Sequence, residues 1–292
     1  MSKQQVAFIG LGVMGYPMAG YLSKAGYKTK VYNRTKAKAD KWAKEYDGVA
    51  CETPREAAEG CDFVFICVGN DDDVRSIVYG EDGALVGLKA GAVLVDHTTT
   101  SAELAVELAE ACQKVGNHFI DAPVSGGQAG AENGVLTIMC GGESDVFEQA
   151  SPVMDVYAKQ ITLLGENGQG QRCKMVNQIC IGGVLQGLSE AILLAQKSGL
   201  DIDQVVETLK HGAAGSWQME NRASTMAQDK FDFGFAIDWM RKDLGFCLKE
   251  AERVGLDLPL TKMVDAQYAD LQSDGLGRMD TSVLIKALAK NQ

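Results

Sequence analysis

Three glycines separated by one and then two residues lie near the amino terminus, between an apolar segment and a helix-like segment. In such a setting the first glycine permits a tight turn, the second lets a ligand approach the backbone, and the third allows close helix–strand packing. The N–H groups that open the helix can then bind an anion. A turn without a ligand is the alternative. The pattern predicts a dinucleotide-binding loop formed by Gly10, Leu11, Gly12, Val13, Met14 and Gly15.

The second apolar segment, TKVYN, ends without the acidic residue that usually holds the adenine ribose of such a cofactor. Its place is taken by Asn33, Arg34 and Thr35, which can all donate hydrogen bonds. A guanidinium fits a phosphate group well, whereas a carboxylate repels one. These residues therefore predict a preference for NADP, with NAD left possible. The alternative for Arg34 is a solvated arginine that stacks on adenine without discriminating between the two cofactors.

Two later segments carry groups suited to a small anion. The loop DAPVSGGQAGAENG contains Ser125-Gly126-Gly127, which either cradles a carboxylate with its hydroxyl and amides or forms only a flexible turn. Farther along, Lys174 opens a long apolar segment, and Asn177 and Gln178 follow at helical spacing, so the three side chains share one helix face. A lysine in such a helix is unusual unless it is paired or functional. A lysine at the helix mouth that reaches solvent is the alternative.

Polar residues also follow two other strand-like segments, at the ends where ligands collect in parallel sheets. Thr98, Thr99 and Thr100 either reach the nicotinamide ribose or cap the next helix, and we expect Thr99 to contact the cofactor. His97 precedes them, but its place at a strand end does not make it catalytic. The run Asp71-Asp72-Asp73 is interpreted as a solvated helix start rather than a metal site, because aspartates favour helix amino termini.

The pattern of short apolar segments indicates the elements that position these groups. Strands rich in valine and isoleucine that alternate with helices are typical of βαβ units around a buried parallel sheet. The predicted strands cover 6–10, 29–33, 63–68, 92–97, 118–124, 136–141 and 161–165. The predicted helices between them cover 14–25, 36–46, 72–79, 101–115 and 144–157.

Beyond residue 165 the pattern is helical throughout. A long segment at 173–199 has Gly182, Gly183 and Gly187 in its interior, which suggests close packing of another backbone. Further helices are predicted near 201–210, 238–254, 259–273 and 281–290. The fold class is therefore α/β, with an amino-terminal Rossmann dinucleotide-binding domain over residues 1–165. An all-helical domain follows over residues 166–292, beginning with a long interdomain helix.

Composition restricts the possible partners and compartment. The 292 residues carry a formal net charge of -11, which argues against nonspecific binding to nucleic acid or an anionic membrane. No apolar run approaches the roughly 20 residues of a membrane span, and no secretory signal is recognised. The eight cysteines form no CxxC pair and the histidines number only three, so we expect free thiols, no metal site and a cytoplasmic location.

Four segments in a fixed order, FIGLGVMGYPMAGYL, DAPVSGG, GQGQRCKMVNQ and KDLGFCLKEA, make the chain resemble the β-hydroxyacid dehydrogenase family. This family includes 3-hydroxyisobutyrate dehydrogenase, tartronate semialdehyde reductase and glyoxylate/succinic semialdehyde reductase. The resemblance covers essentially the full length and implies a Rossmann domain followed by a helical domain, with the long helix contributing to assembly. The glycines of that helix favour a homodimer or homotetramer, but they would pack equally well within one chain.

The resemblance also implies roles for individual residues. Lys174 is the implied catalytic general acid and base for hydride transfer between NADP(H) or NAD(H) and a small β-hydroxy acid or its semialdehyde. Lys242 is implied to close over the cofactor. Many family members have Asn-Asn where this chain has Asn177-Gln178, and residues 68–71 depart from the Leu-Pro sequence that is common in the family. The residues implied to bind substrate are Ser125, Gly126, Gly127, Asn177, Gln178, Trp217 and Asp243.

Three alternatives stay open at this point. Trp217 lies where family members place a pocket wall, but it can equally be a helix-packing residue. An imine reductase has the same architecture but usually lacks the lysine. A noncatalytic nucleotide-sensing or assembly protein tends to keep the glycines and lose the lysine. Because this chain has both features, the sequence favours the dehydrogenase, whereas the individual hydroxy acid, the cofactor preference and the direction of the reaction are left open.

Overall fold

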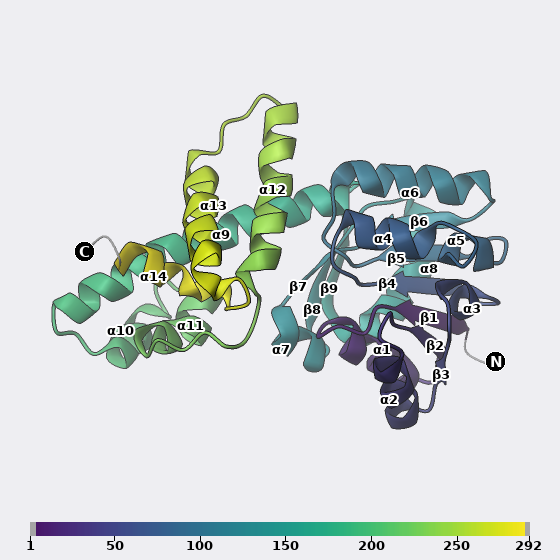
Figure 1. The fold of residues 1–292 in the computed structure, drawn as a ribbon, viewed down its shortest axis with the longest axis horizontal. Coiled ribbons are helices and arrows are strands. Elements are labelled where there is room, and N and C mark those ends of the chain that lie inside the picture. The colour runs from purple at the N-terminus through teal and green to yellow at the C-terminus, as the bar shows by residue number, and fades with distance from the viewer. Residues whose placement is uncertain (1–3, 290–292) are drawn as a thin grey trace. The chain divides into compact units, whose positions relative to one another are not determined.

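The structure is a computed structural model that describes residues 4–289. The chain divides into two compact units, Met1–Lys174 and Met175–Gln292. Among the described residues, all strands lie in the first unit, and the second unit is built of helices (Figure 1). This arrangement confirms the predicted fold class, a Rossmann domain followed by an all-helical one.

A six-stranded parallel sheet forms the centre of the first unit, in the order β3-β2-β1-β4-β5-β6. From β1 the chain builds one half of the sheet outward through β2 and β3, and it then returns to the other side of β1 and builds the second half through β4, β5 and β6. The switch point of the strand order therefore lies between β1 and β4. In such sheets ligands bind beyond the carboxyl ends of the strands at this switch point. The strands are β1 (Gln5–Ile9), β2 (Lys28–Tyr32), β3 (Val49–Ala50), β4 (Phe63–Ile66), β5 (Val93–Asp96) and β6 (His118–Asp121).

Helices cover both faces of this sheet, with α1 and α2 on one face and α4 and α6 on the other (Figure 1). Alternate strand residues point to opposite faces: Phe8 packs in the cluster that contains Met18 and Trp42, whereas Ile9 packs in the cluster with Val74. Burial on both faces explains why the strands are almost continuously apolar. The helices are α1 (Gly15–Lys24), α2 (Lys36–Tyr46), α3 (Pro54–Ala58), α4 (Asp71–Val78), α5 (Ala84–Gly87) and α6 (Ala102–Lys114).

Of the last three predicted strands, only the first part of 118–124 joins the parallel sheet, as β6, whereas the strands predicted over 136–141 and 161–165 lie outside it, contrary to the sequence-based expectation. The segment predicted as one strand, 118–124, bends after Asp121, where Pro123 has no N–H to donate to a ladder. The chain then enters a separate three-stranded sheet, in which β7 pairs antiparallel with β8 and β8 pairs parallel with β9. Its elements are β7 (Val124–Ser125), α7 (Gly127–Glu132), β8 (Leu136–Cys140), α8 (Ser144–Met154) and β9 (Ala158–Leu163).

The helical part of the chain begins with α9, the longest helix, which runs continuously across the boundary between the units. In the second unit α12 and α13 lie side by side (Figure 1). A Cβ on Gly183 would lie 3.3 Å from Leu260, so close packing explains this glycine, whereas one on Gly187 would meet no atom within 4 Å. The helices are α9 (Gln169–Lys197), α10 (Ile202–Leu209), α11 (Trp217–Ala227), α12 (Ile237–Arg253), α13 (Pro259–Leu271) and α14 (Leu284–Ala289).

Helix α9 also corrects the expectation that no segment is long enough to span a membrane. By length and apolar composition alone, Gln169–Lys197 passes that criterion. A core helix of a globular domain passes it too. In the second unit α9 packs its buried face on α12 and α13, with Gly182 near Met240 and Val264.

Candidate active site

Two of the three glycines of the predicted dinucleotide loop, Gly10 and Gly15, have a distinct steric reason in the structure. Gly10 has a φ of +98°, and a Cβ there would collide with the carbonyl oxygen of Cys67. A Cβ on Gly15 would collide with the carbonyl oxygen of Gly10, which would block the close packing of α1 on β1. Gly12 is exposed and would meet nothing within 4 Å, so this face of the loop is open. These features match the turn, the ligand approach and the packing role expected of the pattern.

The loop is held by the strand beside it rather than by its own side chains. Gly10 donates its N–H to the carbonyl of Tyr32 at 2.9 Å, and Leu11 donates to Asn33 Oδ1 at 2.9 Å. The amide nitrogen of Asn33 donates to the Thr35 carbonyl at 3.0 Å, so the whole Asn33 side chain serves the loop and the turn after β2. No side chain caps the start of α1. Tyr16 donates its N–H to the Gly12 carbonyl at 3.0 Å and Pro17 has no N–H, so the donors that would meet a pyrophosphate are the N–H groups from Gly12 to Gly15.

At the end of β2, Arg34 lies next to an acidic residue from another element. Arg34 Nη1 is 3.4 Å from Oδ1 of Asp73, which belongs to the first turn of α4. The aspartate run does start a helix, as predicted: α4 begins at Asp71, and the side chain of Asn70 accepts the Asp73 N–H at 2.8 Å. The Asp71 carboxylate accepts from the N–H and hydroxyl of Ser101. This run is therefore part of two helix starts.

The threonines after β5 differ in exposure. Thr98 and Thr100 are buried, and Thr98 Oγ1 accepts the Val68 N–H at 3.0 Å. Thr99 is half-buried, which leaves it the accessible member of the three. The helix that follows, α6, is capped by Ser101, whose hydroxyl accepts the Leu104 N–H. The alternative in which the threonines provide this cap is therefore wrong.

His97 is a packing residue. Its ring is buried, with Nδ1 2.6 Å from the Ala122 carbonyl and Nε2 3.0 Å from the Tyr157 hydroxyl. The ring also stacks on Phe65 at a centroid distance of 5.8 Å. Burial lowers the pKa of His97 to about 4, although the hydrogen bond to Ala122 opposes this shift. The imidazole is thus neutral near pH 7 and is enclosed by the core.

Asp121 fixes the start of helix α9, a role that sequence reasoning missed. Its Oδ1 accepts the Gly168 N–H at 2.8 Å and its Oδ2 accepts the Gln171 N–H at 2.9 Å. The Gln171 side chain donates to the Thr98 carbonyl at 2.8 Å and accepts the Thr100 N–H at 3.0 Å. Burial raises the pKa of Asp121 to about 6, and the N–H donors oppose that shift. A signal was present, because this carboxyl ends an apolar strand where a buried charge needs partners.

Lys174 lies one turn beyond Gln171 on the same helix and is 7% exposed. Lysine is rarely buried to this extent unless it is paired or functional. The hydrogen bonds at Asp121 and Gln171 tie the helix to the carboxyl ends of β5 and β6, and they therefore set where the Lys174 side chain begins. The interpretation of Lys174 as a solvent-reaching lysine is wrong.

The Ser125-Gly126-Gly127 segment connects β7 to α7 and lies at the surface. Gly126 and Gly127 have φ values of +135° and +60°, a region that favours glycine. Both glycines are exposed, a Cβ on Gly127 would meet nothing within 4 Å, and no side chain caps α7. A hydroxyl and accessible backbone amides thus lie together, as a carboxylate-binding loop requires.

In the second unit, four predicted site residues form one connected network. Asn177 Nδ2 donates to Gln178 Oε1 at 2.8 Å, and Gln178 Nε2 donates to Asp243 Oδ2 at 2.7 Å. The Lys242 ammonium is 3.2 Å from Asp243 Oδ1. Gln178 and Asp243 are buried. The residue that replaces the family's second asparagine therefore links the Asn177 amide to the Asp243 carboxylate.

Trp217 has a different environment. It begins α11, is half exposed, and its ring lies 4.7 Å from the guanidinium of Arg222. Arg222 in turn forms an ion pair with Asp280 at 3.1 Å and also lies over the Phe233 ring at 4.9 Å. The contact of Trp217 with Arg222 thus favours a packing role within the helical unit, and a place in a substrate pocket stays a prediction.

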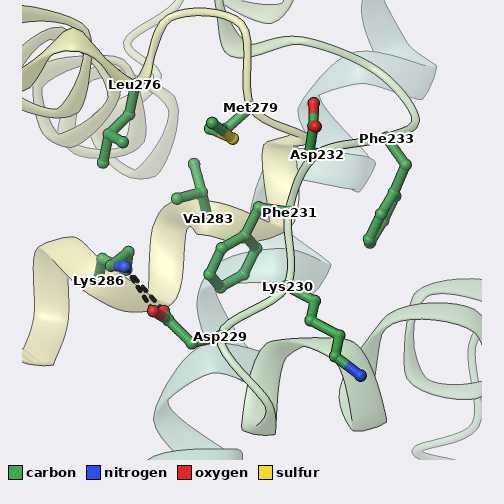
Figure 2. Close-up of a pocket in the computed structure, with 9 residues that line it drawn as sticks. All are labelled: Asp229, Lys230, Phe231, Asp232, Phe233, Leu276, Met279, Val283 and Lys286. Atoms are coloured by element: carbon green, nitrogen blue, oxygen red, sulfur yellow. Dashed lines mark hydrogen bonds and ion pairs between the residues drawn. The ribbon is translucent and has the colours of Figure 1, made fainter.

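A pocket of about 410 Å³ lies in the helical unit, but it contains none of the predicted site residues. Figure 2 shows the apolar side chains at its centre and the ion pair between Lys286 and Asp229, 2.7 Å apart, at one edge. The Lys286 ammonium also lies 5.6 Å from the centroid of the Phe231 ring. The lining residues are Asp229, Lys230, Phe231, Asp232, Phe233, Leu276, Met279, Val283 and Lys286.

Metal and disulfide chemistry have no visible basis in residues 4–289. No group of three or more histidine, cysteine, aspartate or glutamate side chains there is arranged to hold a metal ion. All eight cysteines are free thiols. Burial raises the pKa of Cys61 to about 11 and that of Cys112 to about 12, so these two thiols are protonated and unreactive at neutral pH.

Comparisons with known proteins agree with this geometry. Residues 5–165 match the family described as the NAD-binding domain of 6-phosphogluconate dehydrogenase, and residues 168–288 match the NAD-binding family of NADP-dependent 3-hydroxyisobutyrate dehydrogenase. The chain is 36% identical to 2-hydroxy-3-oxopropionate reductase of Escherichia coli over 97% of both chains. It is 40% identical to a probable 3-hydroxyisobutyrate dehydrogenase-like protein of Arabidopsis thaliana, over 99% of this chain and 86% of the relative.

A solved structure supports the same relationship over the whole length. The 3-hydroxyisobutyrate dehydrogenase of Mycobacterium tuberculosis, in a structure with L-serine, superimposes with a TM-score of 0.87. It is 28% identical, and the match covers 98% of this chain and 99% of that one.

Proposed function

Since this chain belongs to the β-hydroxyacid dehydrogenase family, we propose that it interconverts a small β-hydroxy acid and its semialdehyde with NADP(H), and less readily with NAD(H). One observation carries the proposal: a buried lysine, Lys174, follows directly from a helix start that Asp121 and Gln171 hold against the carboxyl ends of two sheet strands. Ligands of this fold collect at those strand ends.

The protein's part of the chemistry is proton transfer and positioning. In the reducing direction, the Lys174 ammonium donates a proton to the carbonyl oxygen as hydride reaches the carbonyl carbon. In the oxidising direction, the neutral amine accepts the hydroxyl proton as hydride leaves the same carbon. When bound, the nicotinamide supplies or accepts that hydride. Ser125 and the amides of Gly126 and Gly127 hold the substrate carboxylate, and this fixes the reacting carbon.

The residues proposed to bind the cofactor lie in the first unit, apart from one. The uncapped start of α1 and the open face at Gly12 fit a pyrophosphate, and Arg34 and Thr35 fit a 2′-phosphate. Thr99 fits the nicotinamide ribose. Lys242 is the exception, because it lies in the second unit, where it pairs with Asp243. We assign Asp243 and Asn177 to substrate binding. Asn33 acts by holding the glycine loop through its hydrogen bond with Leu11, and Gln178 acts by holding the Asn177 side chain.

The same proposal includes location and assembly. Eight free cysteines are consistent with a reducing compartment, and we assign the enzyme to the cytoplasm. Exposed apolar residues of α9, among them Val176 and Leu194, are consistent with a homodimer or homotetramer.

The test combines one variant with two independent measurements. Turnover of NADPH and NADH would be followed with succinic, tartronate and methylmalonate semialdehydes and with glyoxylate. Lys174→Ala removes the proton donor, so we expect turnover to fall by about 10²- to 10⁴-fold. Fluorescence titration should give an NADPH affinity within about two-fold of the natural protein, because the phosphate-binding elements are unchanged.

The matched control is Lys197→Ala, which removes an exposed lysine from the other end of the same helix. This variant should keep both turnover and NADPH affinity. Turnover that survives in Lys174→Ala would contradict the assignment of the lysine. An absence of turnover with all four substrates in the natural protein would contradict the proposed substrate class.

A further inference from the structure

We propose that Asp73 is a specificity-determining residue that opposes Arg34 and weakens the binding of 2′-phosphorylated cofactors. The inference rests on the proposed cofactor site and adds to it a second, opposing charge. Asp73 belongs to the aspartate run 71–73, to which the proposed function gives no role.

The two side chains meet at the end of β2, where the proposed cofactor site would hold the adenine ribose of a dinucleotide. Arg34 follows β2, and Asp73 lies in the first turn of α4, which follows β4. Both strands pair directly with β1, whose end leads into the glycine loop. The 3.4 Å ion pair between Arg34 and Asp73 therefore connects the two strand ends on either side of that loop.

The two partners differ in freedom. The Arg34 side chain is 89% exposed, so it can turn toward a ligand, whereas the Asp73 side chain is 32% exposed. The backbone of Asp73 is held on both sides, because its N–H donates to Asn70 and its carbonyl accepts the Ser76 hydroxyl at 2.7 Å. The backbone of Asp73 is thus fixed in the first turn of α4, and its short side chain keeps the carboxylate beside the exposed Arg34 guanidinium.

A neighbouring cation is neutralised in the same way. Lys36, two residues beyond Arg34, forms an ion pair with Glu52. The ion pairs Arg34–Asp73 and Lys36–Glu52 therefore each offset a positive charge that would otherwise attract a phosphate. Exposed ion pairs contribute little to stability, so we consider their effect on a charged ligand that binds beside them.

A 2′-phosphate approaching Arg34 must compete with the Asp73 carboxylate for the guanidinium and is also repelled by it. A 2′-hydroxyl has no charge and is not repelled, and it can donate a hydrogen bond to the carboxylate. Asp73 therefore narrows the preference for NADP over NAD that Arg34 creates. Its removal should strengthen the binding of 2′-phosphorylated ligands selectively.

The experiment measures binding of 2′,5′-ADP, 5′-AMP, NADPH and NADH by isothermal titration calorimetry. For Asp73→Asn we expect the Kd of 2′,5′-ADP and of NADPH to fall by about three- to ten-fold, as for the loss of one like charge at a screened surface. The Kd values of 5′-AMP and NADH should change by less than about two-fold or rise. The gain in affinity for 2′,5′-ADP and NADPH should shrink as salt rises from 0.05 to 0.5 M, because the Debye screening length falls from roughly 14 to roughly 4 Å.

The matched control is Asp72→Asn, which removes the same charge from the same helix turn. The Asp72 side chain is 97% exposed and lies 3.9 Å from Arg75 rather than near Arg34. This variant should leave all four affinities nearly unchanged. In an Arg34→Gln background, the effect of Asp73→Asn should be reduced by at least half.

Each other outcome contradicts the inference. Equal gains from Asp72→Asn and Asp73→Asn would mean that only net charge matters. An unchanged Kd of 2′,5′-ADP in Asp73→Asn would mean that the carboxylate does not reach the phosphate. If the natural protein bound none of the four ligands, the cofactor proposal itself would fall, and this result is distinguishable from the other two.

Discussion

His97 and Asp121 lie at the carboxyl ends of neighbouring strands, and burial moves their pKa values in opposite directions. The pKa of His97 falls from 6.5 to about 4, and that of Asp121 rises from 3.8 to about 6. Between pH 6.5 and 4 the unfolded chain gains a proton at the histidine that the folded chain does not, so acidification lowers stability there. At the aspartate the folded chain is protonated first, so acidification raises stability. Over this window the two contributions offset each other.

His97→Gln should expose this compensation. The variant loses part of the hydrogen bonding to Ala122 and Tyr157, so it is less stable at pH 7. As pH falls to 4, only the natural protein is penalised by the buried imidazole, and the stability gap should narrow by about 3 kcal/mol. Urea titrations at half-unit steps from pH 4 to 7 measure the gap. A gap that stays constant with pH would contradict the low pKa of His97.

At the scale of elements, helix α9 depends on a carboxylate with two acceptor oxygens. Asparagine has nearly the shape of Asp121 but offers one acceptor, so either the Gly168 or the Gln171 N–H would face an NH₂ group. At pH 8, where the carboxyl is ionised, Asp121→Asn should lower the free energy of unfolding by about 1–3 kcal/mol. Turnover should also fall, because the helix that carries Lys174 loses part of its anchor.

The readouts for this prediction separate positioning from folding. The loss of kcat should exceed any change in NADPH affinity, since the glycine loop does not contact Asp121. Asp155→Asn alters an exposed aspartate at the end of α8 and should change neither stability nor turnover. A variant that is destabilised yet has the natural kcat would mean that Asp121 supports only the fold.

Sequence patterns predicted the long elements well, because apolar periodicity reports burial directly. The helix predicted over 36–46 matches α2 residue for residue, and the other long elements agree to within a few residues. Short elements such as β3 and α3 were missed, since two to five residues carry too little periodicity. Helix α11 was also missed, although Met219, Ala223 and Met226 form its buried face at helical spacing. Alanine and methionine mark such a face weakly.

The site residues divide in the same way, into those that local sequence patterns predict and those whose contacts depend on the fold. The glycine loop and Lys174 carry local signals, because their residue types are unusual in their own segments. The contact between Gln178 and Asp243 joins residues 65 positions apart, and the ion pair between Arg34 and Asp73 joins residues 39 apart. Contacts of this kind depend on how strands and helices pack, so local patterns could not predict them. Asp121 is the first residue of the segment DAPVSGG, but its partners at the start of α9 are likewise distant in sequence.

On the scale of the whole molecule, the chain is two compact units that share one continuous helix. The boundary falls between Lys174 and Met175, inside α9. The proposed proton donor therefore belongs to the unit with the glycine loop, whereas Asn177 and Asp243 belong to the helical unit. Each unit has its own core, so damage to one need not destroy the other.

Asp280 offers a test of this independence. It is buried and accepts hydrogen bonds from Arg222, the Phe235 N–H and both the N–H and hydroxyl of Ser282, all within the helical unit. Asp280→Ala leaves these donors and the Arg222 charge without an acceptor, which should cost about 3–5 kcal/mol. Limited proteolysis with mass spectrometry should then find new cleavage sites only beyond residue 175.

Binding of 2′,5′-ADP at low temperature should persist in Asp280→Ala, because the glycine loop and Arg34 lie in the unit that the substitution does not touch. Asp257→Ala is the control: it removes an exposed carboxylate of the helical unit that pairs with Lys262, and an exposed pair of this kind contributes little to stability. If Asp280→Ala abolished 2′,5′-ADP binding and opened both units to protease together, the two units would fold as one cooperative body, and the boundary at Lys174 would be only geometric.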